Sequence, residues 1–276
     1  MMKHSSNPLG LMALTTLLSF SQWGYAQAPI LLTDHGPNSV AVELSAASLS
    51  LSQDVDNGSS SQVFNNDFQA QGVVITGAAS GNGRVTPFAR FEVSKITPDE
   101  GSGAFSMYEG YLGLALEGER NRHLFYVSAL EYSDDSPGSI SVGGVFRGVS
   151  DPDAKGQYEV YTSLQLQQGT DSASGGHELD FGLRSKALIA PNLYLISRAS
   201  AELQTQVNYV DGSYRRAKPG LEGAFGLAVL PTPNVSISGE LAYYLQSFEY
   251  YTSGNRLALS ELRTGSQAMI QMAVAF

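Results

Sequence analysis

Residues 178–203 read ELDFGLRSKALIAPNLYLISRASAEL, two segments joined by Pro191-Asn192. In each segment, apolar and small residues occupy every second position, with charged or polar residues between them. Side chains of a β-strand point alternately to the two faces of a sheet, so this pattern predicts two strands with one apolar face. A Pro-Asn pair is typical of a tight turn. The stretch therefore predicts an antiparallel hairpin, apolar on one side and charged on the other.

The same alternation recurs along the chain, more weakly toward its start. Segments of about 10 to 13 residues suit a tilted membrane crossing, whereas strands of soluble proteins average about 5 to 6 residues. The sequence therefore predicts an all-β fold, a closed antiparallel up-and-down transmembrane β-barrel. The twelve predicted strands are 39–50, 69–79, 84–95, 105–117, 123–132, 139–147, 158–167, 178–187, 193–203, 221–230, 235–246 and 267–276.

The charged residues of these segments are assigned to the polar face, and none to the apolar face. A positive charge facing lipid at mid-bilayer costs roughly 2 to 4 kcal/mol, while the same charge in a wet lumen costs little. We therefore expect the apolar face to contact outer-membrane lipids and the polar face to line the lumen. The predicted lumen-lining charges are Arg90, Glu92, Glu109, Glu131, Arg147, Glu159, Glu178, Asp180, Arg184, Lys186, Arg198, Glu202, Glu222 and Glu240, with Glu43 on the same face.

The predicted connections alternate in length, as short periplasmic turns and longer extracellular loops do in outer-membrane barrels. Twelve strands satisfy this alternation and leave both termini on one side, while counts of about ten to fourteen stay open. The short connections are 81–83, 118–122, 190–192 and 231–234, the long ones are 51–68, 96–104, 168–176, 206–218 and 249–261, and 133–138 and 148–156 are intermediate.

The first 28 residues have the features of a cleaved signal peptide: Lys3, an apolar core and the small-residue ending Ala26-Gln27-Ala28. The apolar core is about a dozen residues long, shorter than the roughly 20 that a membrane-spanning helix needs. We therefore expect three parts: a signal peptide at 1–28, a short periplasmic segment at 29–38 and a barrel at 39–276. The chain has no cysteine, so disulfides do not hold the fold.

Charge and composition exclude some classes of function. Asp and Glu number 26 against 16 Lys and Arg, so a nucleic-acid backbone would be repelled. The histidines after residue 28 are His35, His123 and His177, and no pair has metal-ligand spacing. We expect no metal, no cofactor and no enzymatic activity. The less favoured alternative is a lipid-acting hydrolase with His177 as base and a nearby serine as nucleophile.

The C-terminal segment ends on an aromatic residue, with Met272, Val274 and Phe276 on one face. This ending resembles the signature by which the barrel-assembly machinery reads outer-membrane barrels. With the signal peptide and the repeated hairpins, nearly all of the remaining chain resembles the outer-membrane β-barrel proteins of Gram-negative bacteria. Its size is similar to that of autotransporter translocator domains, but only about ten residues lie between the predicted signal peptide and the first predicted strand, so we expect a solitary barrel without a passenger. The resemblance implies location in the outer membrane.

The predicted lumen charges indicate what the barrel does. Glu131, Glu178, Asp180, Glu202 and Glu222 are expected near the extracellular side, and they would form an acidic mouth. We therefore expect a narrow, mildly cation-preferring channel for small cationic solutes. The alternative is a non-conducting surface barrel, autotransporter-like, whose extracellular loops bind a partner.

Overall fold

The computed structural model describes residues 39–276 except 80–83, 100–102, 119, 134–137, 151–155, 170–175, 205–206, 209–211 and 233. Within this part of the chain, no helix is long and apolar enough to cross a membrane. The strands are β1 (Ser39–Asp56), β2 (Ser61–Ala78), β3 (Val85–Pro98), β4 (Phe105–Glu117), β5 (Asn121–Tyr132), β6 (Ser139–Val149), β7 (Gly156–Gly169), β8 (Gly176–Ala190), β9 (Leu193–Gln204), β10 (Val207–Asn208), β11 (Tyr214–Ala217), β12 (Gly220–Thr232), β13 (Val235–Tyr251) and β14 (Leu257–Ala275).

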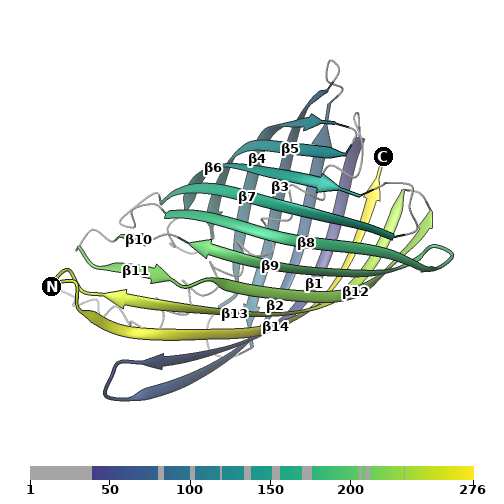
Figure 1. The fold of residues 1–276 in the computed structure, drawn as a ribbon. Coiled ribbons are helices and arrows are strands. Elements are labelled where there is room, and N and C mark those ends of the chain that lie inside the picture. The colour runs from purple at the N-terminus through teal and green to yellow at the C-terminus, as the bar shows by residue number, and fades with distance from the viewer. Residues whose placement is uncertain are drawn as a thin grey trace.

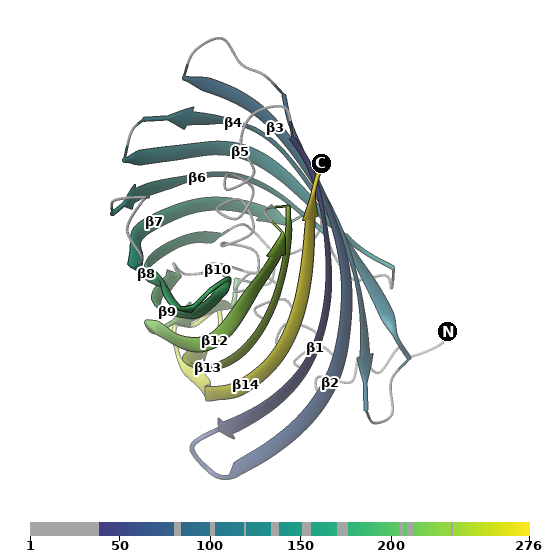
Figure 2. The same cartoon turned by 90° about the vertical axis from the view of Figure 1, so that its right-hand side faces the viewer.

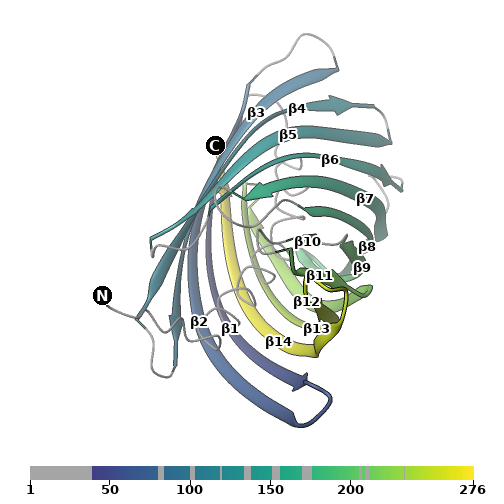
Figure 3. The same cartoon turned by 90° about the vertical axis from the view of Figure 1, so that its left-hand side faces the viewer.

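Twelve of these strands close into an antiparallel barrel. From β1 to β9 and on through β12, β13 and β14, each strand pairs with the next barrel strand along the chain. The barrel closes where β14 pairs with β1, from Ala41 opposite Ala275 to Asp56 opposite Ser260. Figure 2 shows the resulting ring of strands, and Figure 3 shows it from the opposite side. The predicted all-β, up-and-down barrel and its count of twelve strands are confirmed.

The two ends of the barrel differ in how the strands meet. At the turn end, where β14 finishes beside the start of β1, short connections join β8 to β9 and β12 to β13. At the opposite end, here called the hairpin end, β1 and β2 meet at residues 57–60 and β13 and β14 meet at residues 252–256. The prediction of long loops at 51–68 and 249–261 is therefore wrong, because the strands themselves continue through most of these residues (Figure 1).

The predicted loop at 206–218 also contains strand structure. β10 pairs with β11, and β11 pairs with the end of β13, from Tyr214 opposite Tyr251 to Ala217 opposite Phe248. β11 thus continues the line of β12 along β13, after a break at Lys218 and Pro219. The wall on this side of the hairpin end is therefore prolonged by paired strands.

The two faces of the strands separate by polarity as the alternation predicts. Large apolar side chains point outward and stay exposed in the isolated chain, for example Phe225 at 61% and Ile270 at 66%. Their inward-facing neighbours are covered, among them Glu222 and Ala224 on β12. Because exposed apolar surface is unfavourable in water, this outer face suits a lipid environment, as the apolar bands of outer-membrane barrels do.

Four inward-facing aromatic residues each lie directly opposite a glycine of the next strand. Such a pairing leaves room for the ring to cover the glycine backbone, which protects the ladder hydrogen bonds of the sheet. A β-carbon placed on Gly182 would lie only 2.1 Å from the Tyr161 ring, so the glycine is needed for that contact. The four pairs are Phe88 with Gly113, Tyr126 with Gly143, Tyr161 with Gly182 and Tyr244 with Gly265.

The Gly182→Ala variant is expected to be less stable than the natural protein by about 1 to 3 kcal/mol, because the added methyl group displaces the Tyr161 ring. The matched control is Gly223→Ala, since a β-carbon on Gly223 has no atom within 4 Å. Urea titration of both variants folded into lipid vesicles measures the free energy of unfolding. Equal stability of the two variants would contradict the assigned ring packing.

Candidate functional site: the charged lumen

Most of the predicted lumen charges have inward positions in the structure. Glu92, Glu109, Glu159, Asp180, Glu202 and Glu222 are each at most 9% exposed, and Arg90 is 5% exposed. Arg147, Arg184, Arg198 and Glu240 are half-buried on the same face, while Lys186 lies near the turn end with its ammonium 4.8 Å from the centre of the Tyr194 ring. Charges from strands far apart in the sequence therefore share one interior.

Along β6 to β13, basic and acidic groups pair across neighbouring strands. The Arg147 and Arg184 guanidinium groups lie 2.7 and 2.8 Å from the Glu159 carboxylate, so one acid on β7 joins β6 and β8. The Arg198 guanidinium on β9 contacts Glu222 on β12 and lies 2.8 Å from Glu240 on β13. Such charge-assisted contacts fix the side chains against the wall.

Closer to the hairpin end, the same wall is acidic. Asp180 on β8 lies directly opposite Glu202 on β9, and Glu222 follows on β12. Asp180 accepts a hydrogen bond of 2.9 Å from the Ser163 hydroxyl, and Glu202 accepts one of 3.4 Å from Gln246. Facing carboxylates in a protein interior repel each other and favour a nearby cation.

A second acidic group lies on β3 and β4. Glu92 is directly opposite Glu109, and Arg90 pairs with Glu92 at 2.9 Å. On β1, Glu43 accepts a hydrogen bond of 2.6 Å from Gln271. Carboxylates therefore lie on several sides of the lumen rather than on one wall alone.

The inward face also carries apolar groups that the predicted polar lumen did not include. One apolar cluster covers β3 to β7 and contains Phe88, Tyr111, Ala115, Leu124, Tyr126, Val145 and Tyr161. A second covers β1 to β4 and contains Leu49, Leu51, Phe68, Ile96 and Phe105. The inward face is thus mostly polar along β7 to β13 and mixed along β1 to β6, where the two apolar clusters lie beside Arg90, Glu92 and Glu109.

A buried ionic cluster at the hairpin end was not predicted from the sequence. Glu261 on β14 binds the Arg263 guanidinium, accepts a 2.9 Å hydrogen bond from Gln53 on β1 and accepts a 2.8 Å bond from the Tyr250 hydroxyl on β13. The Arg263 guanidinium also lies 4.3 Å from the centre of the Phe248 ring. This latch cluster, Gln53, Phe248, Tyr250, Glu261 and Arg263, joins three strands at the seam where the barrel closes.

Two parts of the lumen prediction need correction. Glu131 is exposed and alternates in step with the outward-facing Phe125 and Val127, so it faces outward instead of into the lumen. Lys95 on β3 is likewise exposed on the outward face. Both residues lie toward the hairpin ends of their strands, where the outer surface leaves the most apolar zone. The prediction that no charge lies on the apolar face is therefore wrong for these two residues.

Some predicted residues lie outside the described part of the structure. Residues 1–38, which include the predicted signal peptide, the short segment after it and His35, are outside it. The backbones of His177 and Glu178 belong to β8, but their side chains are outside the described set. Among the residues described, no three His, Cys, Asp or Glu side chains gather as a metal site would require.

The predicted C-terminal signature forms the last strand of the barrel. Met272 and Val274 pair with Leu44 and Val42 of β1, and Phe276 follows the strand with 75% of its side chain exposed. The Phe276 N–H donates a 2.8 Å hydrogen bond to the Val40 carbonyl. The final aromatic is therefore held at the turn end with its ring on the outside.

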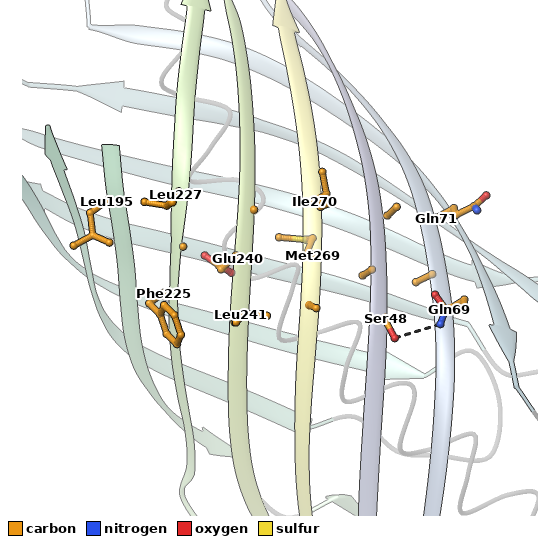
Figure 4. A pocket seen from close by; sticks show the side chains of 16 residues that line it. Ser48, Gln69, Gln71, Leu195, Phe225, Leu227, Glu240, Leu241, Met269 and Ile270 are labelled. Carbon is orange, nitrogen blue, oxygen red and sulfur yellow. Dashed lines mark hydrogen bonds between the residues drawn. The ribbon is translucent and has the colours of Figure 1, made fainter. Parts of the chain in front are cut away.

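A hollow of about 760 Å³ lies on the wall from β9 through β12, β13, β14 and β1 to β2 (Figure 4). Its lining includes the outward-facing Leu195, Phe225, Leu227, Leu241 and Ile270, together with Glu240 and Met269 from the inward alternation. Leu195, Phe225, Leu227, Leu241 and Ile270 are exposed, so the hollow lies mainly on the outer surface of the barrel.

A closed twelve-stranded barrel with an apolar exterior and charged interior defines the class: this chain has the fold of a Gram-negative outer-membrane β-barrel protein. Its structure is similar to the translocator domain of the autotransporter NalP from Neisseria meningitidis, with a TM-score of 0.55 and 13% identity over 95% of this chain and 98% of that chain. It is also similar to an outer-membrane channel from Pseudomonas putida F1, with a TM-score of 0.54 and 9% identity over 87% of this chain and 97% of that chain.

No protein-family model matches the chain, and no curated protein matches it in sequence. At such low identity the two structural likenesses show the fold alone. The fold supports location in the outer membrane, where barrels of this class have their short turns in the periplasm.

Proposed function

We propose that the protein is a non-enzymatic outer-membrane channel with a narrow lumen that favours small cations, inserted by the barrel-assembly machinery through its C-terminal strand. The observation that carries the proposal is the excess of carboxylates facing the lumen. Among the described side chains that face inward, Glu43, Glu92, Glu109, Glu159, Asp180, Glu202, Glu222 and Glu240 outnumber Arg90, Arg147, Arg184, Lys186 and Arg198, and the paired Glu261 and Arg263 of the latch cluster add one charge of each sign.

The arrangement of these charges supports selection of cations at the hairpin end. The acidic group of Asp180, Glu202 and Glu222 lies nearer the hairpin end than the paired Arg147 and Arg184. A cleft with low-dielectric walls concentrates the field of its charges, so a solute arriving from outside would first meet a negative potential. Rings of acidic side chains select cations in other pores for the same reason.

The size of the barrel supports a narrow passage. Barrels of about 8 strands are filled by their own side chains, whereas porins of about 16 to 18 strands hold an aqueous channel. Twelve strands lie between these sizes. Six inward positions of β12 and β13 carry small side chains, which keep that part of the wall thin: Ala224, Gly226, Ala228, Ser236, Ser238 and Ala242.

The proposal predicts cation-biased conductance that depends on the facing carboxylates. The natural protein in planar bilayers under a KCl gradient should give a reversal potential on the cation side. The double variant Asp180→Asn/Glu202→Gln should lower the potassium-to-chloride permeability ratio by about twofold or more, because it removes two lumen charges. The matched control is Glu131→Gln, which removes a carboxylate from the outward face and should leave the ratio unchanged.

Two results would overturn the proposal that the protein is a cation-favouring channel. The first is a silent bilayer with a barrel whose folding is verified by a heat-dependent shift in gel mobility. The second is an anion preference in the natural protein.

A further inference from the structure

The β1–β2 hairpin projects beyond its neighbour β3 at the hairpin end. β2 pairs with β1 from Ser61 to Ala78, but it pairs with β3 only from Phe68 onward. In Figures 1, 2 and 3 the tip of this hairpin extends away from β3. Residues 61–66 therefore form an edge with no neighbouring strand among the described residues.

The backbone of this edge is available for pairing. The Asp67 carbonyl accepts a 2.9 Å hydrogen bond from the Asp99 N–H, so Asp67 directs its backbone groups to the β3 side. In an antiparallel ladder, alternate residues direct their N–H and C=O groups to the same side. Ser61, Val63 and Asn65 therefore direct their backbone groups away from β1, along the open edge.

The edge lacks the features by which proteins prevent strand addition. Exposed edges are usually protected by lysine, proline, a bulge or a covering segment. Residues 61–66 read SQVFNN, without lysine, proline or any charge, and they pair with β1 in unbroken register. Val63 is 61% exposed on the outward face, where it can contact the aliphatic part of a long side chain of an added strand.

Charge around the edge indicates the partner. The whole hairpin, 39–78, contains no lysine or arginine. Asp54 and Asp56 lie opposite Val63 and Ser61, and with Asp67 they are exposed on the same face. These three carboxylates would repel a second copy of the hairpin and attract a basic segment.

We infer that the open edge of β2 at Ser61, Val63 and Asn65 binds an extended basic peptide segment of another protein, which adds to the sheet as a strand. Main-chain hydrogen bonds would give the affinity, as in other cases of β-strand addition. Asp54, Asp56 and Asp67 would select lysine or arginine at alternate positions of the added strand. This site lies outside the lumen and does not depend on conduction.

The test uses a labelled eight-residue peptide of alternating lysine and valine, with fluorescence anisotropy on the full barrel folded in detergent. Binding is expected, and it should weaken when NaCl is raised, because the attraction is between exposed charges. The Val63→Pro variant should bind at least about tenfold more weakly, since proline removes an edge N–H and its ring obstructs the added strand. The matched control Val63→Thr keeps the N–H and should bind as the natural protein does.

A second measurement covers the case in which Val63→Pro does not fold. The same peptide methylated on alternate backbone nitrogens should lose binding to the natural protein, because its donors are blocked. The inference is overturned if the peptide does not bind, if a glutamate-valine peptide binds equally well, or if methylation has no effect. It is also overturned if sedimentation shows that Val63→Pro abolishes a dimer of the natural barrel, because the edge would then hold a second copy.

Discussion

Phe225→Arg is expected to lower the free energy of unfolding in lipid vesicles by roughly 2 to 4 kcal/mol, the cost of a guanidinium near the bilayer midplane. Phe225 lies near the middle of β12 and is 61% exposed on the outward face. Its aromatic ring would contact acyl chains, whereas arginine at the same position must distort the bilayer or extend toward an interface. Urea titration of the barrel in vesicles measures the difference.

The matched control is Val63→Arg, which places the same residue at a site of the same exposure. Val63 is also 61% exposed, but it lies in the projecting part of the β1–β2 hairpin. Water surrounds this position if the outer face is divided as we describe, so a change within about 0.5 kcal/mol is expected. A similar loss in both variants would contradict the assignment of a lipid-facing zone.

Arg263→Ala is expected to destabilise the barrel by about 3 to 5 kcal/mol, because it leaves a buried carboxylate without its cation. The side chains of Arg263 and Glu261 are 1% and 0% exposed, so water does not compensate the loss. The variant also removes the contact between the guanidinium and the Phe248 ring. Heat-induced unfolding, followed by gel mobility and by urea titration, measures the effect.

The double variant Glu261→Gln/Arg263→Met separates charge from packing. It removes both charges together, so it should be more stable than Arg263→Ala alone. The exposed Arg216→Ala serves as the control for losing an arginine near the hairpin end. If Arg263→Ala matched Arg216→Ala in stability, the latch cluster would not hold the seam between β14 and β1.

Much of the architecture could be predicted from alternation alone. Strands such as β8, β9 and β12 carry apolar residues on one face and charged or small residues on the other, because one face contacts lipid and the other the interior. The prediction of twelve strands followed from this pattern and is confirmed. The ends of the strands were harder to predict. Residues 51–68 contain serine, asparagine and aspartate, because strands that extend beyond the apolar zone do not require an apolar face.

Side-chain partners were predictable only where a hairpin brings them together. Glu159 and Arg184 lie on consecutive antiparallel strands, where alternation assigns both to the inward face, and they are directly opposite each other in the structure. Gln53 and Glu261 are separated by 208 residues, and their hydrogen bond depends on the closing register of the barrel. Sequence spacing contains no signal for that register.

Glu131 was assigned to the wrong face of its strand for a different reason. In β5 both faces are apolar, since Leu124, Tyr126 and Leu130 are buried inside while Phe125 and Val127 are outside. Alternation cannot assign a charged residue to one of two apolar faces. Where the interior is also apolar, the two faces of a strand no longer differ in polarity, and the prediction depends on that difference.

The most direct test of the lipid-facing exterior places single tryptophans at consecutive positions of β13 and measures their quenching by lipids with brominated acyl chains. The chain's single tryptophan, Trp23, lies in the predicted signal peptide, so a barrel produced without residues 1–28 gives a silent background. Tryptophan in place of Leu241 or Tyr243 should be strongly quenched, and tryptophan in place of Ala242 should not be. Strong quenching at 242, or equal quenching at all three positions, would contradict a barrel whose alternate residues face lipid and lumen.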